Sequence, residues 1–159
     1  MNYQLNGLRA VVCGSSGGIG LAIAEEFARQ GATCLLLARN KEKLAAAVNK
    51  LPPVENGRHE YIAADFKQTE KLQQLADELL AGNRFHILVN NSGGPPPGDA
   101  IDAGTNDFLS AFQQHLIANH ILTKAQVKGM RELHYGRIIN IISTSVKIPI
   151  KGLGVSNTV

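Results

Sequence analysis

Apolar positions follow two patterns along the chain. Short continuous apolar runs predict five strands, at Ala10–Cys13, Thr33–Arg39, His59–Asp65, Ile87–Asn90 and Arg137–Ser143. Between them, apolar residues recur every three or four positions and predict helices, at Gly18–Gln30, Lys41–Leu51, Thr69–Ala81 and about Thr105–Leu133. Runs such as "TCLLLAR" have no polar alternation, which is typical of parallel strands covered on both faces.

The helical spacing also predicts which apolar side chains share a helix face. Ile19, Ile23 and Phe27 share one face of the first predicted helix, and Gly31 is placed to end it. In the last helical region, Phe108, Phe112 and Leu116 form an apolar face. We expect a second copy of the chain to cover that face, giving a homodimer or a larger homo-oligomer.

Strands that alternate with helices predict an α/β fold, a doubly wound parallel sheet of Rossmann type with helices on both faces. The expected strand order is 3-2-1-4-5, in a three-layer α/β/α architecture. No repeat or linker interrupts residues 1–159, so we expect a single domain. Ligands in such sheets bind at the carboxyl ends of the strands. The unusual residues of this sequence fall at those ends: Gly14, Arg39, Asp65, Asn90 and Ser143.

The stretch "CGSSGGIG", residues 13–20, joins the first predicted strand to the first predicted helix. Glycines allow a tight turn and a close approach of backbone to ligand. The helix start directs free amides and a positive dipole end at that ligand, which suits a pyrophosphate. Ser15 and Ser16 add hydroxyl donors. The alternative is a glycine-rich turn that binds nothing. The glycine spacing and the absence of a following Lys-Ser/Thr pair exclude a P-loop.

This turn, together with "NNSGG" at 90–94 and "RIINIIS" at 137–143, resembles the short-chain dehydrogenase/reductase family. Two positions depart from the family pattern, since Cys13 stands where Thr is usual and Ser92 where Ala is usual. The resemblance implies an NAD(P) site and names Ser143 as the catalytic serine. The cofactor-binding residues it implies are Gly14, Ser16, Gly18, Ile19, Gly20, Asp65, Asn91 and Gly93.

The end of the second strand predicts which cofactor is preferred. An acidic residue there would bind the ribose 2′-hydroxyl of NAD. This chain has Ala38 followed by Arg39, and a guanidinium suits a 2′-phosphate, so NADP is favoured over NAD. The alternative for Arg39 is a solvated charge. Asp65 has two interpretations, an adenine contact or a cap on the following helix.

The catalytic pair of the family departs most from its pattern. A Tyr with a Lys four residues later is usual, and no tyrosine here has that Lys. The Tyr position corresponds to Ser156, as in a divergent branch of the family, and the Lys would fall beyond Val159. A serine needs an activating base to replace the tyrosine. The resemblance further implies that the chain lacks the family's C-terminal third.

A further residue of the family's proton relay, an Asn on the fourth helix, corresponds to His115, eight residues before Thr123. His115 could relay a proton. A surface or interface histidine is the simpler interpretation. Asn119, one turn further, is a weaker substitute.

The resemblance predicts an NADP-dependent oxidoreductase acting on a small carbonyl or alcohol. Ser143 would polarise the oxygen, and Ser156 would occupy the acid/base position. Because the Tyr–Lys pair is missing, the alternative is an inactive remnant that binds nucleotide or acts as a scaffold. An interaction module using only the fourth-helix surface would leave the strand-end residues unexplained.

Composition narrows the function classes. The net charge is +3, and no Lys/Arg cluster interleaves with aromatics, so nucleic-acid binding is not expected. No apolar stretch has the length of a membrane span, and no signal peptide is recognisable. Cys13 and Cys34 lack metal-ligand spacing, which predicts buried thiols in a reducing compartment and no metal site. We therefore expect a cytoplasmic protein.

Overall fold

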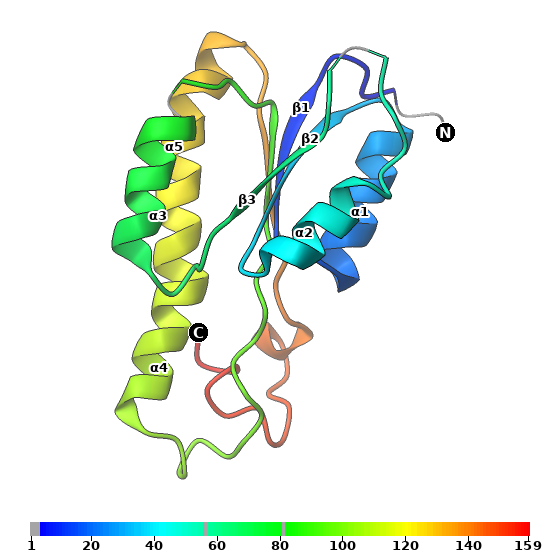
Figure 1. Cartoon of the computed structure of the whole chain (residues 1–159). Helices are drawn as coiled ribbons and strands as arrows, with labels where there is room; N and C mark the ends of the chain where they lie inside the picture. Colours follow the sequence, from blue (N-terminus) through cyan, green and yellow to red (C-terminus); the bar gives the residue numbers. More distant parts are fainter. Residues whose placement is uncertain (1–3, 56, 81) are drawn as a thin grey trace.

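A computed structural model describes residues 4–55, 57–80 and 82–159. Within these residues the centre is a five-stranded sheet of order β3-β2-β1-β4-β5, in which every pairing is parallel (Figure 1). The strands are β1 (Arg9–Cys13), β2 (Thr33–Ala38), β3 (Glu60–Ala63), β4 (Ile87–Asn90) and β5 (Arg137–Asn140). The predicted fold class and strand order are confirmed.

Helices cover both faces of the sheet. On one side lie α1 (Gly18–Arg29) and α2 (Lys41–Val48), and on the other lie α3 (Thr69–Leu75) and α5 (Ala118–Glu132) (Figure 1). A π-helical segment, Ala76–Leu80, continues α3, and a second, Gln113–Ile117, joins α4 (Thr105–Phe112) to α5. A short 3₁₀ turn, Thr144–Val146, follows β5. The three-layer arrangement is therefore the one predicted.

The core consists of two apolar clusters, one on each face of the sheet. Successive strand residues point to opposite faces, so Val11 packs towards α3 and α5 while Val12 packs towards α1 and α2. Leu35 and Leu36 divide in the same way on β2. Because both faces are buried, the central strands need apolar residues at every position, which explains the continuous runs in the sequence.

Several predicted boundaries are too long. The second helix ends at Val48 rather than Leu51, and the third strand covers only Glu60–Ala63. The last strand ends at Asn140, the final residue that pairs with β4, and the chain then turns so that Ser143 caps the 3₁₀ turn. The predicted end of the third helix, Ala81, lies outside the described residues.

The face that Ile19, Ile23 and Phe27 share is not the most buried face of α1. Ile19 is 61% exposed, and Ile23 and Phe27 are only half-buried. The buried residues are Gly20, Ala24 and Ala28, whose fourfold spacing makes a narrow stripe of small side chains. Small residues let the helix axis approach the sheet closely, and Ile19 is left at the edge where the glycine turn opens.

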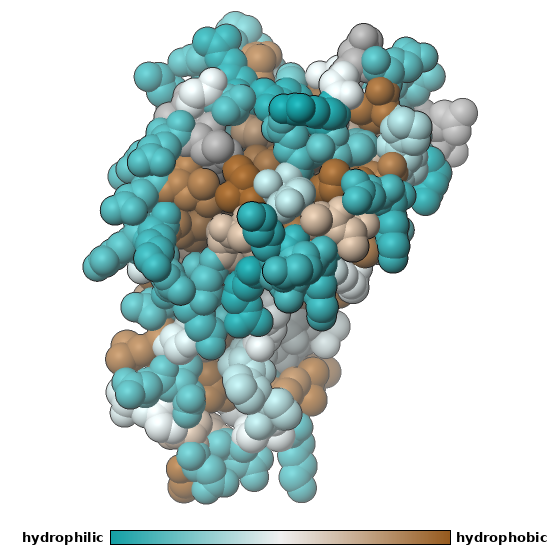
Figure 2. Space-filling view, viewed as in Figure 1, coloured by the Kyte–Doolittle hydropathy of each residue, from teal (hydrophilic) through white to brown (hydrophobic). Residues whose placement is uncertain are grey.

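Apolar side chains also remain at the surface. Figure 2 shows hydrophobic groups between α3 and β3, and again at the end of the molecule that carries α4. On the predicted fourth-helix face, Phe112 is 45% and Leu116 is 55% exposed, while Phe108 is half-buried. The chain around β5 is also exposed, with Ile142 at 70%. None of the helices described has both the length and the apolar character required to cross a membrane.

Candidate functional site

The glycine turn lies against the segment that follows β4. Gly14 has φ of +61° and Gly18 has φ of +56°, so both adopt the left-handed region that favours glycine. A Cβ on Gly14 would lie 2.6 Å from Nδ2 of Asn91, and a Cβ on Gly20 would meet the carbonyl oxygen of Gly14. The turn therefore needs glycine for its conformation at Gly14 and for close packing at Gly20.

The start of α1 presents backbone amides at this turn. Its N-cap residue, Gly17, supplies no side-chain hydrogen bond to the first turn. The initial amides of a helix have no partner within the helix, and together with the dipole they favour an anion. The geometry fits the predicted pyrophosphate site.

The two serines of the turn have different roles. The side chain of Ser15 is fully buried, and its hydroxyl donates to the carbonyl oxygen of Val12 at 2.7 Å. The expectation that Ser15 offers a donor to a ligand is therefore wrong, because that hydroxyl stabilises the turn itself. Ser16 lines the adjoining cleft, and its role as a donor to a ligand stays a prediction.

Five of the predicted cofactor-binding residues line one cleft of about 580 Å³ at the carboxyl edge of the sheet: Gly14, Ser16, Arg39, Asp65 and Gly93. They lie in the segments that follow β1, β2, β3 and β4, and the parallel topology brings the carboxyl ends of these strands to a common edge. The cleft has four further residues that the sequence analysis missed, Asn40, Lys43, Phe66 and Gln114.

Lys43 adds a second positive charge beside Arg39. The Oδ1 atom of Asn40 accepts from the Lys43 amide at 2.7 Å and thereby caps the start of α2. In the described part of the chain, neither Arg39 nor Lys43 forms an ion pair. An Asn N-cap directly after a strand, with Lys three residues later, was the sequence signal that could have identified Lys43.

Of the two interpretations of Asp65, the cap on the following helix is wrong, and the adenine contact stays a prediction. Its Oδ1 accepts from the Lys67 amide at 3.1 Å, within the turn that leads into α3. The same carboxylate lines the cleft. It does not cap α3 itself, because the N-cap position there belongs to Gln68.

A second cleft, of about 720 Å³, adjoins the first along residues 91–94. It brings together the two predicted catalytic serines, Ser143 and Ser156, with Ile19 and Asn91. Its other polar lining residues are Ser92, His115, Asn119, His120, Thr123 and Asn140. The first cleft therefore holds residues predicted to bind the nucleotide, and the second, called the reaction cleft below, holds the two predicted catalytic serines. Gly18 and Gly20 line neither cleft.

The hydroxyl of Ser143 is held by a neighbouring buried serine. Its Oγ accepts from the Ser145 amide at 3.1 Å and from the Ser145 hydroxyl at 2.8 Å. These two bonds use the acceptor capacity of the oxygen, and its own proton is left to donate. This arrangement suits a serine that polarises a carbonyl oxygen.

Two asparagines hold the carboxyl end of β4. Asn90 is buried, and its Nδ2 donates to Oδ1 of Asn140 at 2.8 Å and to Oγ1 of Thr123 at 3.3 Å. Asn91 donates to the carbonyl oxygen of Cys13 at 3.2 Å. The hydrogen bonds of Asn90 join β4 to β5 and α5, and the hydrogen bond of Asn91 joins β4 to the glycine turn.

His115 lies in the π-helical segment between α4 and α5 and is half-buried, and its interpretation as a surface or interface histidine stays a prediction. Its Nδ1 lies 2.9 Å from Oγ of Ser92. Its Nε2 is buried and has no hydrogen-bond partner in the described structure. Burial, and secondly the positive charge of Lys67, lower the pKa of His115 below its ordinary value of 6.5.

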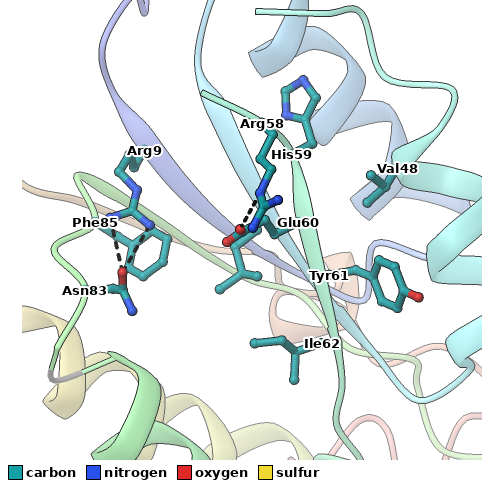
Figure 3. Close-up of a pocket in the computed structure, with 10 residues that line it drawn as sticks. Arg9, Val48, Arg58, His59, Glu60, Tyr61, Ile62, Asn83 and Phe85 are labelled. Atoms are coloured by element: carbon teal, nitrogen blue, oxygen red, sulfur yellow. Dashed lines mark hydrogen bonds and ion pairs between the residues drawn. The ribbon is translucent and has the colours of Figure 1, made fainter. Parts of the chain in front are cut away.

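The cysteines are buried and free, as predicted. Burial raises the pKa of Cys13, which stands at the usual Thr position, to about 12. Tyr61 lines a separate groove at the amino end of the sheet, with Arg9 and Arg58 (Figure 3). Tyr135 lies in another depression, beside His134. Neither tyrosine lines the cleft that contains Ser143.

Comparison with known proteins agrees with this geometry. The family model described as short chain dehydrogenase matches residues 9–155. An uncharacterised oxidoreductase of Mycobacterium tuberculosis is 33% identical over 158 residues, which cover 98% of this chain and 60% of that protein. A 3-oxoacyl-[acyl-carrier-protein] reductase of Rickettsia bellii is 34% identical over 140 residues, which cover 88% of this chain and 55% of that protein.

Solved structures have the same fold. L-sorbose reductase from Gluconobacter frateurii, complexed with NADPH and L-sorbose, superposes with a TM-score of 0.90 at 30% identity, covering 99% of this chain and 60% of that one. A metagenomic short-chain oxidoreductase in complex with NADP gives a TM-score of 0.86 at 32% identity, covering 97% of this chain and 69% of that one. The chain belongs to the short-chain dehydrogenase family, and it spans between about two-fifths and three-fifths of the length of the curated relatives it matches.

Proposed function

We propose that this chain binds NADP and that its protein is an oxidoreductase acting on a small carbonyl compound or alcohol. One observation carries the proposal: the glycine turn, Arg39 and Lys43 line one cleft, and the cleft that adjoins it contains Ser143. A site for a phosphorylated nucleotide thus lies next to a hydroxyl that can polarise an oxygen. The relatives solved with NADPH or NADP support the choice of cofactor.

The residues present fit the cofactor. The amides at the start of α1 suit its pyrophosphate, and Arg39 with Lys43 suits its 2′-phosphate. The cofactor supplies the hydride chemistry when it is bound. The chain's own contribution is to bind the nucleotide, to polarise the substrate oxygen through Ser143, and to hold the proton that the reaction requires. Ser156 lies in the reaction cleft, but a serine there cannot titrate near neutral pH by itself.

A second candidate is a family member that binds nucleotide without turnover. The observation that favours it is the position of the described tyrosines, which lie outside the reaction cleft. It shares the nucleotide site with the first candidate and differs only in chemistry. A cytoplasmic location stays a prediction for both.

An activity assay separates the two candidates. NADPH oxidation is followed with a panel of aldehydes and ketones, for the unchanged chain and for Ser143→Ala. Turnover that Ser143→Ala lowers by about 10²-fold or more is the result expected for the oxidoreductase, since Ser143 polarises the reacting oxygen. Nucleotide binding by calorimetry with no turnover on any compound would instead favour the second candidate.

A further inference from the structure

A groove of about 440 Å³ lies at the amino end of the sheet, at the edge opposite the two clefts (Figure 3). It follows the start of β3, which in the described sheet pairs only with β2. Figure 3 shows residues from both sides of that strand around the groove, Arg9, Asn83 and Phe85 on one side and Val48 and Tyr61 on the other. The proposed oxidoreductase function uses none of these side chains.

The guanidinium of Arg9 is held in a fixed orientation in this groove. Its Cζ lies 4.5 Å from the centre of the Phe85 ring, a cation–π contact. Its two terminal nitrogens both donate to Oδ1 of Asn83, at 3.5 and 3.4 Å, and Nη1 also donates to the carbonyl oxygen of Arg84 at 3.4 Å. All three distances are long for N–H···O bonds. The planar fork is therefore oriented by its surroundings but weakly bonded.

The charge of Arg9 has no counter-ion. Within residues 4–55, 57–80 and 82–159, Arg9 takes part in no ion pair, and the oxygens that accept from it are neutral. The field of this charge reaches His86, whose pKa is lowered by burial and secondly by Arg9. Two parallel N–H groups that now share one amide oxygen match the two oxygens of a carboxylate, which would also supply the missing negative charge.

The other ionisable side chains in the groove leave it with one net positive charge. Arg58 forms an ion pair with Glu60 at 3.1 Å, and the Arg58 side chain is 86% exposed, so this pair contributes little. His59 accepts from the Cys34 amide through Nδ1, and its Nε2 lies 2.8 Å from the carbonyl oxygen of Pro52. These two bonds fix the neutral form of the ring. A single negative charge therefore balances the groove.

The remainder of the lining is apolar. Leu35 and Phe85 are buried and Ile62 is half-buried, and all three belong to or pack against the core cluster beneath α3 and α5. Figure 2 shows hydrophobic groups at the surface in this region, between α3 and β3. The volume lies in the range of small-molecule sites, which combine apolar walls with a few placed polar groups.

We propose that this groove binds a small monocarboxylate with an apolar body, of the aryl- or alkyl-carboxylic acid class. The carboxylate accepts from both terminal nitrogens of Arg9 in place of Oδ1 of Asn83, and the apolar body lies along Ile62 and Phe85. A phosphate monoester, with its second negative charge, would exceed the one net charge available beside Glu60. The site is separate from the nucleotide cleft and does not rest on the proposed oxidoreductase function. The competing explanation is that Arg9 only braces the loop before β4.

The test is calorimetric binding of phenylpropanoate and of its uncharged amide, phenylpropanamide. Saturating NADP is present throughout, so that Arg39 and Lys43 are not open to the carboxylate. We expect the unchanged chain to bind phenylpropanoate about 10–100-fold more tightly than the amide, the equivalent of a hydrogen bond to a charged group. Arg9→Gln should remove this preference. Arg9→Lys keeps the charge without the fork and should bind phenylpropanoate about tenfold less tightly than the unchanged chain.

Arg137→Gln is the matched control. The Arg137 guanidinium also lies over an aromatic ring, 4.6 Å from the centre of Tyr135, and it too forms no ion pair with any residue that the structure describes. It lines a different depression, at the end of α5. Phenylpropanoate affinity in Arg137→Gln should stay within about twofold of the unchanged chain. Chemical denaturation confirms that each variant is folded, and Arg9→Lys decides the outcome if Arg9→Gln is not.

A second readout is the imidazole NMR titration of His86 in the unchanged chain. Bound phenylpropanoate should raise the pKa of His86 towards its ordinary value of 6.5, because the anion offsets the charge of Arg9. The amide should leave that pKa where it is, and so should the carboxylate if Arg9 is only a brace.

Four results would each overturn the inference: equal affinity for acid and amide, no binding of either, a preference for the acid that survives Arg9→Gln, or equal losses in Arg9→Gln and Arg137→Gln. A His86 pKa that phenylpropanoate does not move would overturn it as well. The oxidoreductase proposal is untouched by all of these results, since its own assay follows NADPH oxidation.

Discussion

The side-chain amide of Asn91 donates to the carbonyl oxygen of Cys13 at 3.2 Å, across the gap between the ends of β4 and β1. Seventy-eight positions separate the two residues in the chain, so this contact exists only when the parallel sheet has formed. The same Nδ2 packs closely against the glycine turn, because a Cβ on Gly14 would lie only 2.6 Å from it. The proposed nucleotide site is therefore supported from the neighbouring strand.

Gly14→Ala should destabilise the fold. The new methyl group would lie 2.6 Å from Nδ2 and 2.7 Å from the backbone oxygen of Asn91, and its residue would need a φ of +61°. We expect a loss of about 1–3 kcal/mol in the free energy of unfolding, the usual cost of a non-glycine residue held in a rare conformation. Chemical denaturation measures it.

Gly17→Ala is the matched control for that substitution. A Cβ at Gly17 meets nothing within 4 Å, and the residue has φ of 172°, which is extended backbone open to any residue. Its unfolding free energy should stay within about 0.5 kcal/mol of the unchanged chain. Equal effects of the two substitutions would contradict the account of the turn.

Acid should weaken the fold through His86. Its Nδ1 accepts from the Arg9 amide at 3.0 Å, so the neutral ring holds the start of β1. Burial, and secondly the charge of Arg9, lower the pKa of His86 from its ordinary value of 6.5. A histidine with a lowered folded-state pKa contributes stability that is complete above about pH 6.5 and is lost as the pH falls towards the folded-state value.

Denaturation curves at pH 7.5 and below pH 6 check this expectation. His86→Gln keeps an acceptor but does not titrate, so its stability should depend less on pH than that of the unchanged chain. His115, whose pKa is also lowered, contributes a dependence of the same sign. In His86→Gln the unfolding free energy should therefore change less steeply with pH, but it should still change. An equally steep dependence on pH in His86→Gln and in the unchanged chain would rule out the proposed role of His86.

The two thiols should be unreactive in the folded chain. Burial raises the pKa of both Cys13 and Cys34 to about 12, and the thiolate is the reactive form. Iodoacetamide should label neither residue under native conditions and both after unfolding, as read by mass spectrometry. Rapid native labelling at Cys13 would show that the strand end opens far more easily than its packing implies.

Self-association stays a prediction from the apolar fourth-helix face. Phe112 and Leu116 are both substantially exposed, and exposed apolar groups of this size are commonly covered by another chain. Light scattering at high micromolar concentration should show a dimer or a larger oligomer. Leu116→Glu should shift the association equilibrium towards the monomer. A monomer at that concentration in the unchanged chain would end this prediction.

The sequence predicted the sheet because its central strands are apolar on both faces, and that pattern has few alternatives. It also predicted the strand ends that line the proposed nucleotide cleft, from Gly14, Arg39 and Asp65. Ser15 was misread, because the burial of a hydroxyl in a tight turn depends on tertiary packing. The small-residue stripe of α1 depends on the same packing and was not predicted. Lys43 was missed since its place beside Arg39 follows from the cap that Asn40 makes on α2.

The reaction cleft was harder to predict for a related reason. Ser143 could be placed from the pattern around the last strand, but the bonds it accepts from Ser145 depend on a turn that the sequence analysis assigned to neither helix nor strand. His115 and Ser92 are 23 positions apart, and helical periodicity gives no sign that a π-helical segment brings them together. Pairings of this kind arise from the packing of whole elements.

The most direct test of the account is calorimetric binding of 2′-phospho-AMP and AMP to the unchanged chain and to Arg39→Ala. We predict that the unchanged chain prefers 2′-phospho-AMP, and that Arg39→Ala weakens its binding by about 1.5–3 kcal/mol, the range for a hydrogen bond to a charged group, with little change for AMP. Lys43→Ala should have an effect of the same kind. Equal affinity of the unchanged chain for the two nucleotides would contradict the reading of Arg39 and Lys43 as the 2′-phosphate site, and binding of neither would contradict the nucleotide site as a whole.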